Sequence, residues 1–569
     1  RALLEFDRTL LYLLALALFA SLGGQAWRLR WMVGAMALAI VVVCAAALAS
    51  RLLPDVLPAT TSAADIRLNY PITYSNSLGL LAALGIVLCF GLTCSERASR
   101  PARVLAAAAL PVLSAALLLT LSRGALAAAI IGLVVFLVVG HPRALAAGLA
   151  AAVPATTIAV TRTYDARLLF SANPLTQAAR DQGEHIAVVL ALCALGAAIV
   201  RALLLVSDRA VGELRVPPQT RRLVLGAGAG VLAVVVAAAA IAFDVRRQYE
   251  AFVDAPPVPA ATTDDVRSRL VQADNNGRLE FWRVAFGELE AQPLRGRGAG
   301  TFELSWERER RNSDFVRNAH SLYLEVMSEL GLVGLALLAA TLLAILIGLA
   351  RRVRGPDRAL FATILAACAT WLVAAGADWH WELPAVTLWL FALGGTAIAR
   401  VREQPVGRPI LALVPRFAVA GALSAVMALV PLALHGSQGR LEKAIAQLER
   451  GRCERVETLA RQSLNGVGVR PQGYELLARC ALEMDDRSRA IRMIGEAIER
   501  DPENWRPWYG LAVVRARAGL DPRPAARSAL RRNPNEPLAR EAVRRFSVHA
   551  NAGGWRRASR GLNILVPPL

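Results

Sequence analysis

The chain has 569 residues, of which 55% are hydrophobic and only 19% are charged. This composition is too apolar for a water-soluble globular protein of that length, so a lipid bilayer is the expected solvent. The formal net charge of +20 would suggest nucleic-acid binding in a soluble protein. In a membrane protein, however, basic residues gather in cytoplasmic loops, and we therefore expect no nucleic-acid partner.

Apolar runs long enough to cross the roughly 30 Å hydrocarbon core of a bilayer recur about twelve times. They occupy residues 9–26, 31–50, 77–95, 103–121, 124–140, 143–160, 185–206, 222–243, 329–350, 359–377, 384–400 and 409–432. We therefore expect an all-α fold in which residues 1–432 form a polytopic transmembrane helical bundle. Because the chain opens at Arg1 with no signal-peptide pattern, we expect it to be a fragment that has lost upstream spans.

The short connections between these runs are alternately rich and poor in arginine. The arginine-rich side holds Arg28, Arg30, Arg97, Arg100, Arg103, Arg143, Arg209, Arg215, Arg221, Arg222, Arg351, Arg352, Arg354, Arg358, Arg400, Arg402 and Arg408. The positive-inside rule predicts that this side is cytoplasmic. The connection at 244–328 and everything from about residue 433 onward are then expected to be extracytoplasmic.

The loop at 244–328 is far longer than a usual connection, which makes it a functional candidate by length alone. Its residues 278–289 alternate apolar and charged side chains at helical spacing. The apolar ones, which fall on one helical face, are Phe281, Trp282, Ala285 and Leu289. This pattern predicts a helix lying at the membrane interface.

Residues 433–569 are much less hydrophobic and are predicted to form a soluble domain of amphipathic helices. Ala497 and Pro502 recur 32 residues later as Ala529 and Pro534, close to the 34-residue tetratricopeptide period. We expect helix pairs near 441–465, 471–500 and 504–533. Such repeat arrays usually bind partners or act as spacers, so a protein partner on this domain is expected. Cys453 and Cys480 lie where antiparallel neighbours can bring them together in an oxidising compartment.

Two arginines are candidates for phosphate binding. Arg123 interrupts two apolar runs at the outer end of a span, and an ionisable group at such a depth is a functional hypothesis by default. Guanidinium suits phosphate because its fork of donors matches the phosphate oxygens and it stays charged. Arg278 opens the loop helix and offers a second fork. The alternatives are that Arg123 reaches lipid headgroups and that Arg278 is a solvated helix charge.

His320 lies where the long loop meets the next span. Histidine titrates near neutral pH, so His320 can accept a proton from an acceptor hydroxyl. A helix cap or a headgroup contact is the alternative role. His380 stands between Trp379 and Trp381 and is interpreted first as part of an aromatic belt. The sequence has no phosphate-binding loop, dinucleotide fingerprint or His-Glu-x-x-His motif, so no cofactor and no metal site are expected.

Four pieces of sequence form a recognisable combination by their order and their common outward side. They are residues 67–79, 121–125, 276–282 with 296–302, and 319–325 with 329–331. Together with the predicted spans, this combination resembles the O-antigen ligase and polymerase superfamily of bacterial membrane glycosyltransferases, some of which carry a C-terminal tetratricopeptide-like extension.

This resemblance implies a GT-C-like bundle with an external loop that caps a cavity. It implies metal-independent transfer of a glycan from an undecaprenyl-pyrophosphate carrier to an acceptor hydroxyl at the outer face of the bacterial plasma membrane. It also implies that Arg123, Arg278 and Arg67 bind the pyrophosphate and that His320 is the catalytic base or orients the acceptor. Many members have asparagine after this histidine, whereas this chain has Ser321.

Several alternatives remain open at this stage. The enzyme can be a ligase or a polymerase, with a glycan or a lipid as acceptor. A protein O-oligosaccharyltransferase of the same superfamily would differ only in having a protein acceptor. A non-catalytic anchor that presents the repeats to a cell-envelope complex would explain residues 433–569 but would leave Arg123 and the long loop without a role. A transporter is disfavoured because no charged residue is seen deep in the middle of a predicted span.

Overall fold

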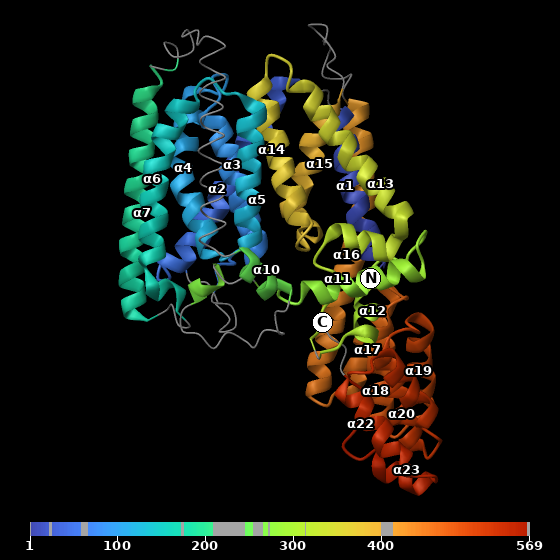
Figure 1. Cartoon of the computed structure of the whole chain (residues 1–569). Coiled ribbons are helices and arrows are strands. Elements are labelled where there is room, and N and C mark those ends of the chain that lie inside the picture. The colour runs from blue at the N-terminus through green and yellow to red at the C-terminus, as the bar shows by residue number, and fades with distance from the viewer. Residues whose placement is uncertain are drawn as a thin grey trace.

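The computed structural model describes the chain in ten segments. They are residues 2–21, 25–57, 67–171, 176–206, 208, 245–253, 266–270, 274–312, 314–399 and 414–565. Within these segments every regular element is a helix, which confirms the expected all-α fold. Figure 1 shows an upright helical bundle with a second helical domain attached at one end.

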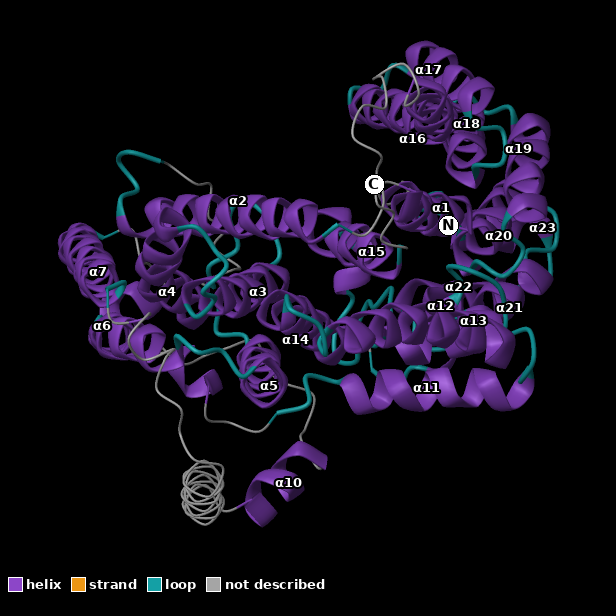
Figure 2. Cartoon of the chain, turned by 90° about the horizontal axis from the view of Figure 1, so that it is seen from above, coloured by secondary structure: helices purple, strands orange, loops and turns teal. Residues whose placement is uncertain are grey.

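Among the described residues, ten helices build the bundle. They are α1 (Ala2–Ser21), α2 (Ala26–Leu52), α3 (Ser75–Thr93), α4 (Arg100–Leu119), α5 (Arg123–Gly140), α6 (Leu145–Asp165), α7 (Gln177–Leu204), α13 (Leu322–Arg352), α14 (Arg358–Ala375) and α15 (Pro384–Ile398). Short 3-10 helices lie at η1 (Arg167–Phe170), η2 (Val266–Leu270) and η3 (His380–Glu382). Seen from above, α3 lies in the middle, with α2, α4, α5 and α14 around it (Figure 2).

Eight of the described helices, α2 to α7, α13 and α14, are long and apolar enough to cross a membrane. The protein is therefore a multi-pass membrane protein, but the expected count of about twelve spans is not confirmed. Helix α1 carries Glu5, Asp7 and Arg8 near its start, and α15 has only 15 residues. The apolar run at 222–243 lies outside the described residues.

The long loop contributes three helices at the lower end of the bundle in Figure 1: α10 (Val245–Val253), α11 (Arg278–Ala291) and α12 (Phe302–Glu309). Helix α11 confirms the helix expected at 278–289. Phe281 and Ala285 are buried as part of its apolar face, whereas Trp282 and Leu289 are half-buried. This face packs against α12 and α13, so its main contacts are with protein.

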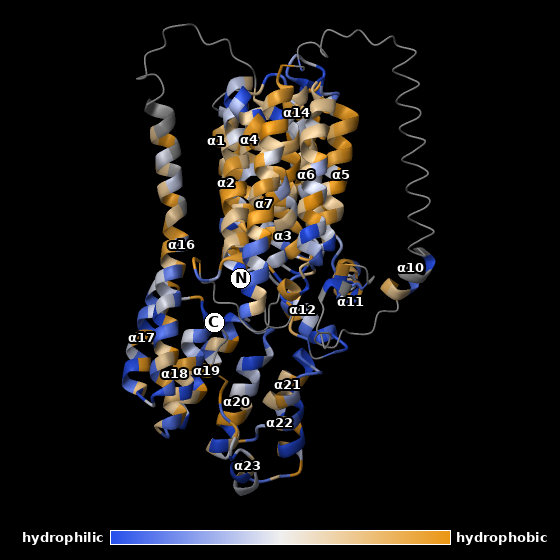
Figure 3. Cartoon of the chain, turned by 90° about the vertical axis from the view of Figure 1, so that its left-hand side faces the viewer, coloured by the Kyte–Doolittle hydropathy of each residue, from blue (hydrophilic) through white to orange (hydrophobic). Residues whose placement is uncertain are grey.

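The C-terminal domain continues from a long helix that stands beside the bundle. Its helices are α16 (Val414–Glu449), α17 (Cys453–Gly466), α18 (Pro471–Glu483), α19 (Arg487–Arg500), α20 (Trp505–Ala518), α21 (Arg523–Arg532), α22 (Pro537–Ser547) and α23 (Ala552–Ala558). Figure 3 shows the change from the apolar bundle to the largely hydrophilic lower domain. Successive helices pack against each other, and the domain boundary predicted at residue 432 falls inside the continuous helix α16.

Equivalent contacts recur along this domain. Ala497 and Ala529 are both fully buried. The Arg500 guanidinium lies 4.2 Å from the centroid of the Tyr474 ring, and Arg532 lies 4.7 Å from that of Trp508. These contacts indicate stacked helix pairs, while the tetratricopeptide assignment itself stays a prediction.

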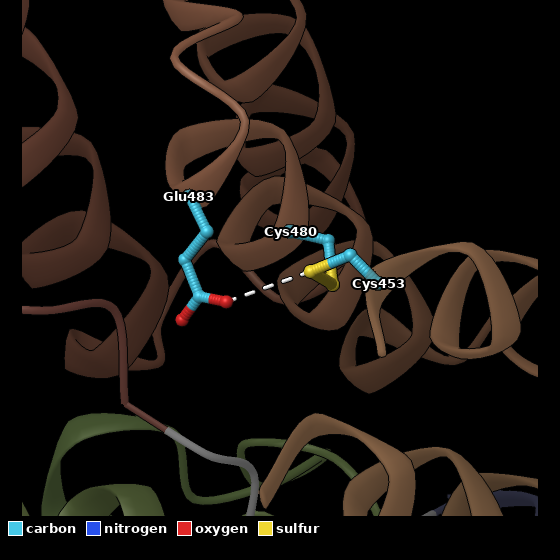
Figure 4. A group of neighbouring side chains, drawn as sticks. All are labelled: Cys453, Cys480 and Glu483. Carbon is cyan, nitrogen blue, oxygen red and sulfur yellow. Dashed lines mark hydrogen bonds between the residues drawn. A yellow bond between two sulfur atoms is a disulfide. The ribbon is translucent and has the colours of Figure 1, made fainter. Parts of the chain in front are cut away.

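Cys453 and Cys480, which the sequence places within possible reach of each other, form a disulfide with a Cα–Cα distance of 5.3 Å. The bond joins the start of α17 to α18, and the Glu483 carboxylate lies beside it (Figure 4). Cys453, Cys480 and Glu483 are also the one group of potential metal ligands found among the described residues. Sulfur atoms joined in a disulfide are not available as thiolate ligands, so the group fits a structural cross-link better than a metal centre.

Candidate functional site

Asp378 is the centre of a buried polar cluster at the end of the bundle that also carries the C-terminal domain. It follows α14 and is only 4% exposed. Its Oδ1 accepts hydrogen bonds from Tyr74 Oη at 2.8 Å and from the Trp379 backbone N–H at 2.9 Å. Its Oδ2 accepts from Asn76 Nδ2 at 2.5 Å and from Arg278 Nη2 at 3.3 Å. The carboxylate thus joins three parts of the chain: the start of α3, the start of α11 and the end of α14.

The charge state of Asp378 follows from these neighbours. Burial alone would raise the pKa of the carboxyl, but His380, Arg278 and His320 together hold that pKa below its usual value. Asp378 is therefore a buried carboxylate anion at neutral pH, and it can hold a guanidinium group in a fixed orientation.

Arg278 is the first residue of α11, and its side chain donates two hydrogen bonds to the segment that follows α14. Besides the contact with Asp378, its Nε donates to the Ala377 carbonyl oxygen at 2.8 Å. A guanidinium group carries five N–H donors, and these two contacts use one at Nε and one at Nη2. The segment after α14 therefore fixes the plane of the group, and its other donors can take further ligands.

Arg67 joins the same cluster from the chain before α3. Its Nε donates to the Thr120 carbonyl oxygen at 2.8 Å, and its Nη2 donates to Asn76 Oδ1. Since Asn76 also donates to Asp378, Arg67 and Arg278 are linked through one asparagine and one carboxylate.

Arg123 lies nearby but is not bonded to Asp378. Its Nη2 donates to the backbone carbonyl oxygen of Asp274 at 2.8 Å, four residues before Arg278. The Ser122 hydroxyl caps α5 by accepting a hydrogen bond from the Ala125 N–H at 3.4 Å. This cap fixes the start of the helix, and therefore the position of Arg123, its first residue. Arg123 therefore contacts the segment that leads into α11, and the three arginines lie in one connected region.

His320 has an unusual backbone conformation, with φ of 51°. Such left-handed angles are rare in residues other than glycine and are concentrated at functional positions. Its Nδ1 lies 3.2 Å from the Asn318 carbonyl oxygen, so the proton of the neutral ring belongs on Nδ1 and Nε2 is the free acceptor. Burial lowers the pKa of His320, which Asp378 raises and Arg278 lowers. His320 is therefore neutral and able to accept a proton.

His380 and its flanking tryptophans are packed inside the protein, so the aromatic-belt interpretation was wrong. The His380 ring is buried, and its Nδ1 lies 2.9 Å from Ser77 Oγ. Trp379 stacks on Tyr74 with ring centroids 4.3 Å apart, and the Trp381 carbonyl accepts from Tyr12 Oη at 2.5 Å. These contacts hold the Asp378 segment against α1 and α3.

The glycine-rich turn after α11 docks onto a break in α13. Gly331 has φ of +65°, and a side chain there would collide with the Leu294 backbone. Two residues earlier, the Glu329 carboxylate accepts hydrogen bonds from the N–H groups of Gly300 at 2.8 Å and Phe302 at 3.0 Å. Glu329 therefore caps the start of α12, and the pieces at 296–302 and 329–331 meet in space.

The four residues named from the sequence, Arg67, Arg123, Arg278 and His320, lie in one region of the structure, and their role stays a prediction. The sequence did not indicate that Asp378 joins this region to Asn76 and Tyr74. Asp378 had a signal: it is an acidic residue beside a histidine in a short, arginine-poor connection. Tyr74 and Asn76 lie in the 67–79 piece on which the resemblance rests. Their contact with Asp378 was not predicted, because it depends on α3 and α14 being neighbours.

Residues 178–339 match a family model described as O-antigen ligase. The matched range includes Arg278 and His320, and it ends before Asp378. No curated protein matches the chain. The match supports membership of the O-antigen ligase superfamily and, in general terms, a membrane ligase or polymerase with glycosyltransferase-like activity.

Proposed function

We propose that the protein transfers a glycan from an undecaprenyl-pyrophosphate carrier to an acceptor hydroxyl on the extracytoplasmic face of the bacterial plasma membrane. The single observation that carries the proposal is the cluster at one end of the bundle, in which Asp378 fixes Arg278 beside the half-buried, neutral His320. The family match over the segment that holds Arg278 and His320 agrees with it.

The arginines suit the leaving group. Arg278 is oriented by Ala377 and Asp378. Arg67 and Arg123 belong to the same connected region through their hydrogen bonds to Asn76 and Asp274. We propose that their guanidinium groups hold the pyrophosphate. Fixed positive charges then stabilise the negative charge that develops as the carrier leaves, which is the role a divalent ion has in other transferases. This makes the reaction metal-independent and GT-C-like.

His320 suits the acceptor. Its Nε2 accepts the proton of the acceptor hydroxyl while that oxygen forms a bond to the anomeric carbon of the glycan. The bond between the anomeric carbon and the pyrophosphate oxygen breaks, and the electron pair leaves with the pyrophosphate. The proton on His320 is released before the next transfer.

The proposed orientation of the protein in the membrane rests on the charge at the end of the bundle opposite to Asp378. There, Asp357 pairs with Arg30 at 2.7 Å and with Arg97 at 2.9 Å, in connections that belong to the arginine-rich side. By the positive-inside rule that end is cytoplasmic, so the site and the C-terminal domain are extracytoplasmic. The disulfide between Cys453 and Cys480 fits an oxidising compartment.

The proposal is tested by supplying a labelled oligosaccharide on undecaprenyl pyrophosphate to membranes that contain the full-length protein. We expect label to move to an acceptor, and the chemical nature of the product identifies that acceptor. Label on a glycan or a lipid supports a polymerase or ligase, whereas label on a protein supports an O-oligosaccharyltransferase. Label that stays on the carrier under all conditions contradicts the proposal.

A further inference from the structure

The end of α12 is bound by the C-terminal domain. Glu307, in the last turn of this loop helix, accepts a hydrogen bond at Oε1 from the indole Nε1 of Trp505 at 3.1 Å. Three residues further on, Arg310 Nη2 donates to Asn533 Oδ1 at 3.1 Å. Trp505 begins α20, and Asn533 lies in the turn between α21 and α22, so two separate places on the C-terminal domain contact one end of α12.

Arg310 is held by further groups of the same turn. Its guanidinium pairs with the Glu536 carboxylate at 3.6 Å, and its backbone carbonyl accepts from Asn535 Nδ2. Arg310 is 6% exposed and Asn533 is fully buried. Breaking a buried ion pair or hydrogen bond leaves an uncompensated polar group, which is strongly unfavourable. The contact is therefore specific, unlike a loose encounter between two exposed surfaces.

A continuous path of contacts leads from Arg310 to His320. Arg310 Nη1 donates to the Asp314 carbonyl oxygen at 2.9 Å, and Trp306 Nε1 donates to the same oxygen at 2.8 Å. The buried Trp306 ring meets the Phe281 ring edge-on, with centroids 4.9 Å apart. Phe281 in turn lies 5.2 Å from the His320 ring. Each contact is close-packed, so a displacement at Arg310 reaches the imidazole.

We infer that the C-terminal domain is a positioning element of the transferase site: its docking interface with α12 holds the loop that presents His320 and Arg278. The docking interface consists of Glu307 and Arg310 on the loop and Trp505, Asn533, Asn535 and Glu536 on the domain. This inference rests on the proposed function and adds to it, because a domain that only recruits a partner does not require a buried contact with the loop.

A weakened docking interface should change the pKa of His320, whereas a simple loss of folded protein should lower the amount of activity without changing that pKa. If the loop loosens, His320 becomes more exposed, and its pKa rises towards the ordinary value because burial is what lowers it. Asp378, Arg278 and His380, the charged and titratable groups near His320, stay unchanged in variants of the interface. The acid limb of the pH–rate profile, below which His320 is protonated and inactive, should then move to higher pH.

The experiment compares Asn533→Ala and Trp505→Phe with wild type in the full-length protein in membranes. Trp505→Phe keeps an aromatic ring but removes the indole N–H together with the five-membered ring that carries it. Trp508→Phe is the matched control, because Trp508 lies in the same helix and donates to the Pro502 carbonyl at 2.9 Å, within the repeat domain. Three quantities are measured: kcat and KM for the lipid-linked donor, the acid limb of the pH–rate profile, and hydrogen exchange of residues 302–320.

We expect both interface variants to lower kcat by about 10-fold or more, since small misplacements of catalytic groups cost up to about 100-fold, with KM for the donor nearly unchanged. Their acid limb should move to higher pH and exchange in 302–320 should accelerate, while Trp508→Phe behaves as wild type. Wild-type kcat, acid limb and exchange in both interface variants would overturn the inference. If wild type itself transfers no glycan, the proposed function fails, and the exchange measurement still tests the docking interface.

Discussion

The Arg278 guanidinium donates a hydrogen bond from Nη2 to Oδ2 of the Asp378 carboxylate, and the two atoms lie 3.3 Å apart. The two residues are separated by 100 positions in the sequence. This contact joins the first residue of the loop helix α11 to the connection after α14. The contact defines the site because the side chains of Tyr74 and Asn76 also donate hydrogen bonds to the Asp378 carboxylate.

Replacing Asp378 with asparagine should reduce transfer by about 10- to 100-fold, because it removes the charge that orients Arg278. The amide also places an NH2 group opposite the donors of Asn76 or Arg278. Transfer activity is the measurement, with thermal unfolding as a check on the fold. The matched control is Asp357→Asn, which removes an arginine-bound carboxylate at the opposite end. Equal activity in the two variants would contradict a role for Asp378 in the site.

The pH dependence of transfer follows from His320. The ring must be neutral to accept a proton, and its pKa is lowered by burial. Activity should therefore be present above the folded-state pKa and be lost only when the pH falls below it. We expect the acid limb of kcat/KM to lie at a lower pH than the titration of a solvent-exposed histidine. An acid limb at or above that of an exposed histidine would contradict the lowered pKa of the half-buried His320.

Gly331→Ala should disturb the site from a distance. The position has φ of +65°, and a Cβ there would lie 2.4 Å from the Leu294 backbone, so the docked turn must move. The strained backbone alone should cost about 1–3 kcal/mol of stability, and activity should fall because the turn leads into α12.

The control for this variant is Gly495→Ala in α19, where a Cβ would meet nothing within 4 Å. That substitution should stabilise the helix by roughly 0.5–1 kcal/mol. Thermal unfolding and transfer assays of the two variants separate the docked turn from a general effect of alanine. Wild-type stability in Gly331→Ala would contradict the close backbone approach.

The disulfide predicts a specific pattern of thiol labelling. Of the seven cysteines, Cys44, Cys89, Cys94, Cys193 and Cys368 are free thiols and all are buried. Unfolded, non-reduced protein should therefore take up label at these five positions only, and reduced protein at all seven, as read by mass. Reduction should also destabilise the C-terminal domain by about 3 kcal/mol, the expected contribution of a cross-link that closes a loop of this length. Labelling of seven cysteines without reduction would contradict the bond.

The sequence predicted the helical class, most spans and four site residues because these depend on local signals. Apolar runs reveal spans, and an arginine between two such runs, as at Arg123, is visible without any structure. Asp378 and the docking of Arg310 on Asn533 were not predicted, since they depend on which helices become neighbours. The count of about twelve spans is not confirmed. The run at 222–243 lies outside the described residues, and hydropathy alone does not separate a full span from α1, with its charged start, or from the short helix α15.

The proposed roles of Arg278 and His320 are tested by measuring transfer of labelled glycan by full-length variants of these two residues in membranes. His320→Ala should lose about 100-fold or more of the rate through the missing proton acceptor, and Arg278→Ala a comparable amount through the missing charge at the leaving group. Arg283→Ala is the control, because this arginine lies on the same helix and pairs with Glu280 at 2.8 Å. The account predicts wild-type transfer in the control and near loss of transfer in the other two at equal expression. Normal transfer by both His320→Ala and Arg278→Ala would contradict it.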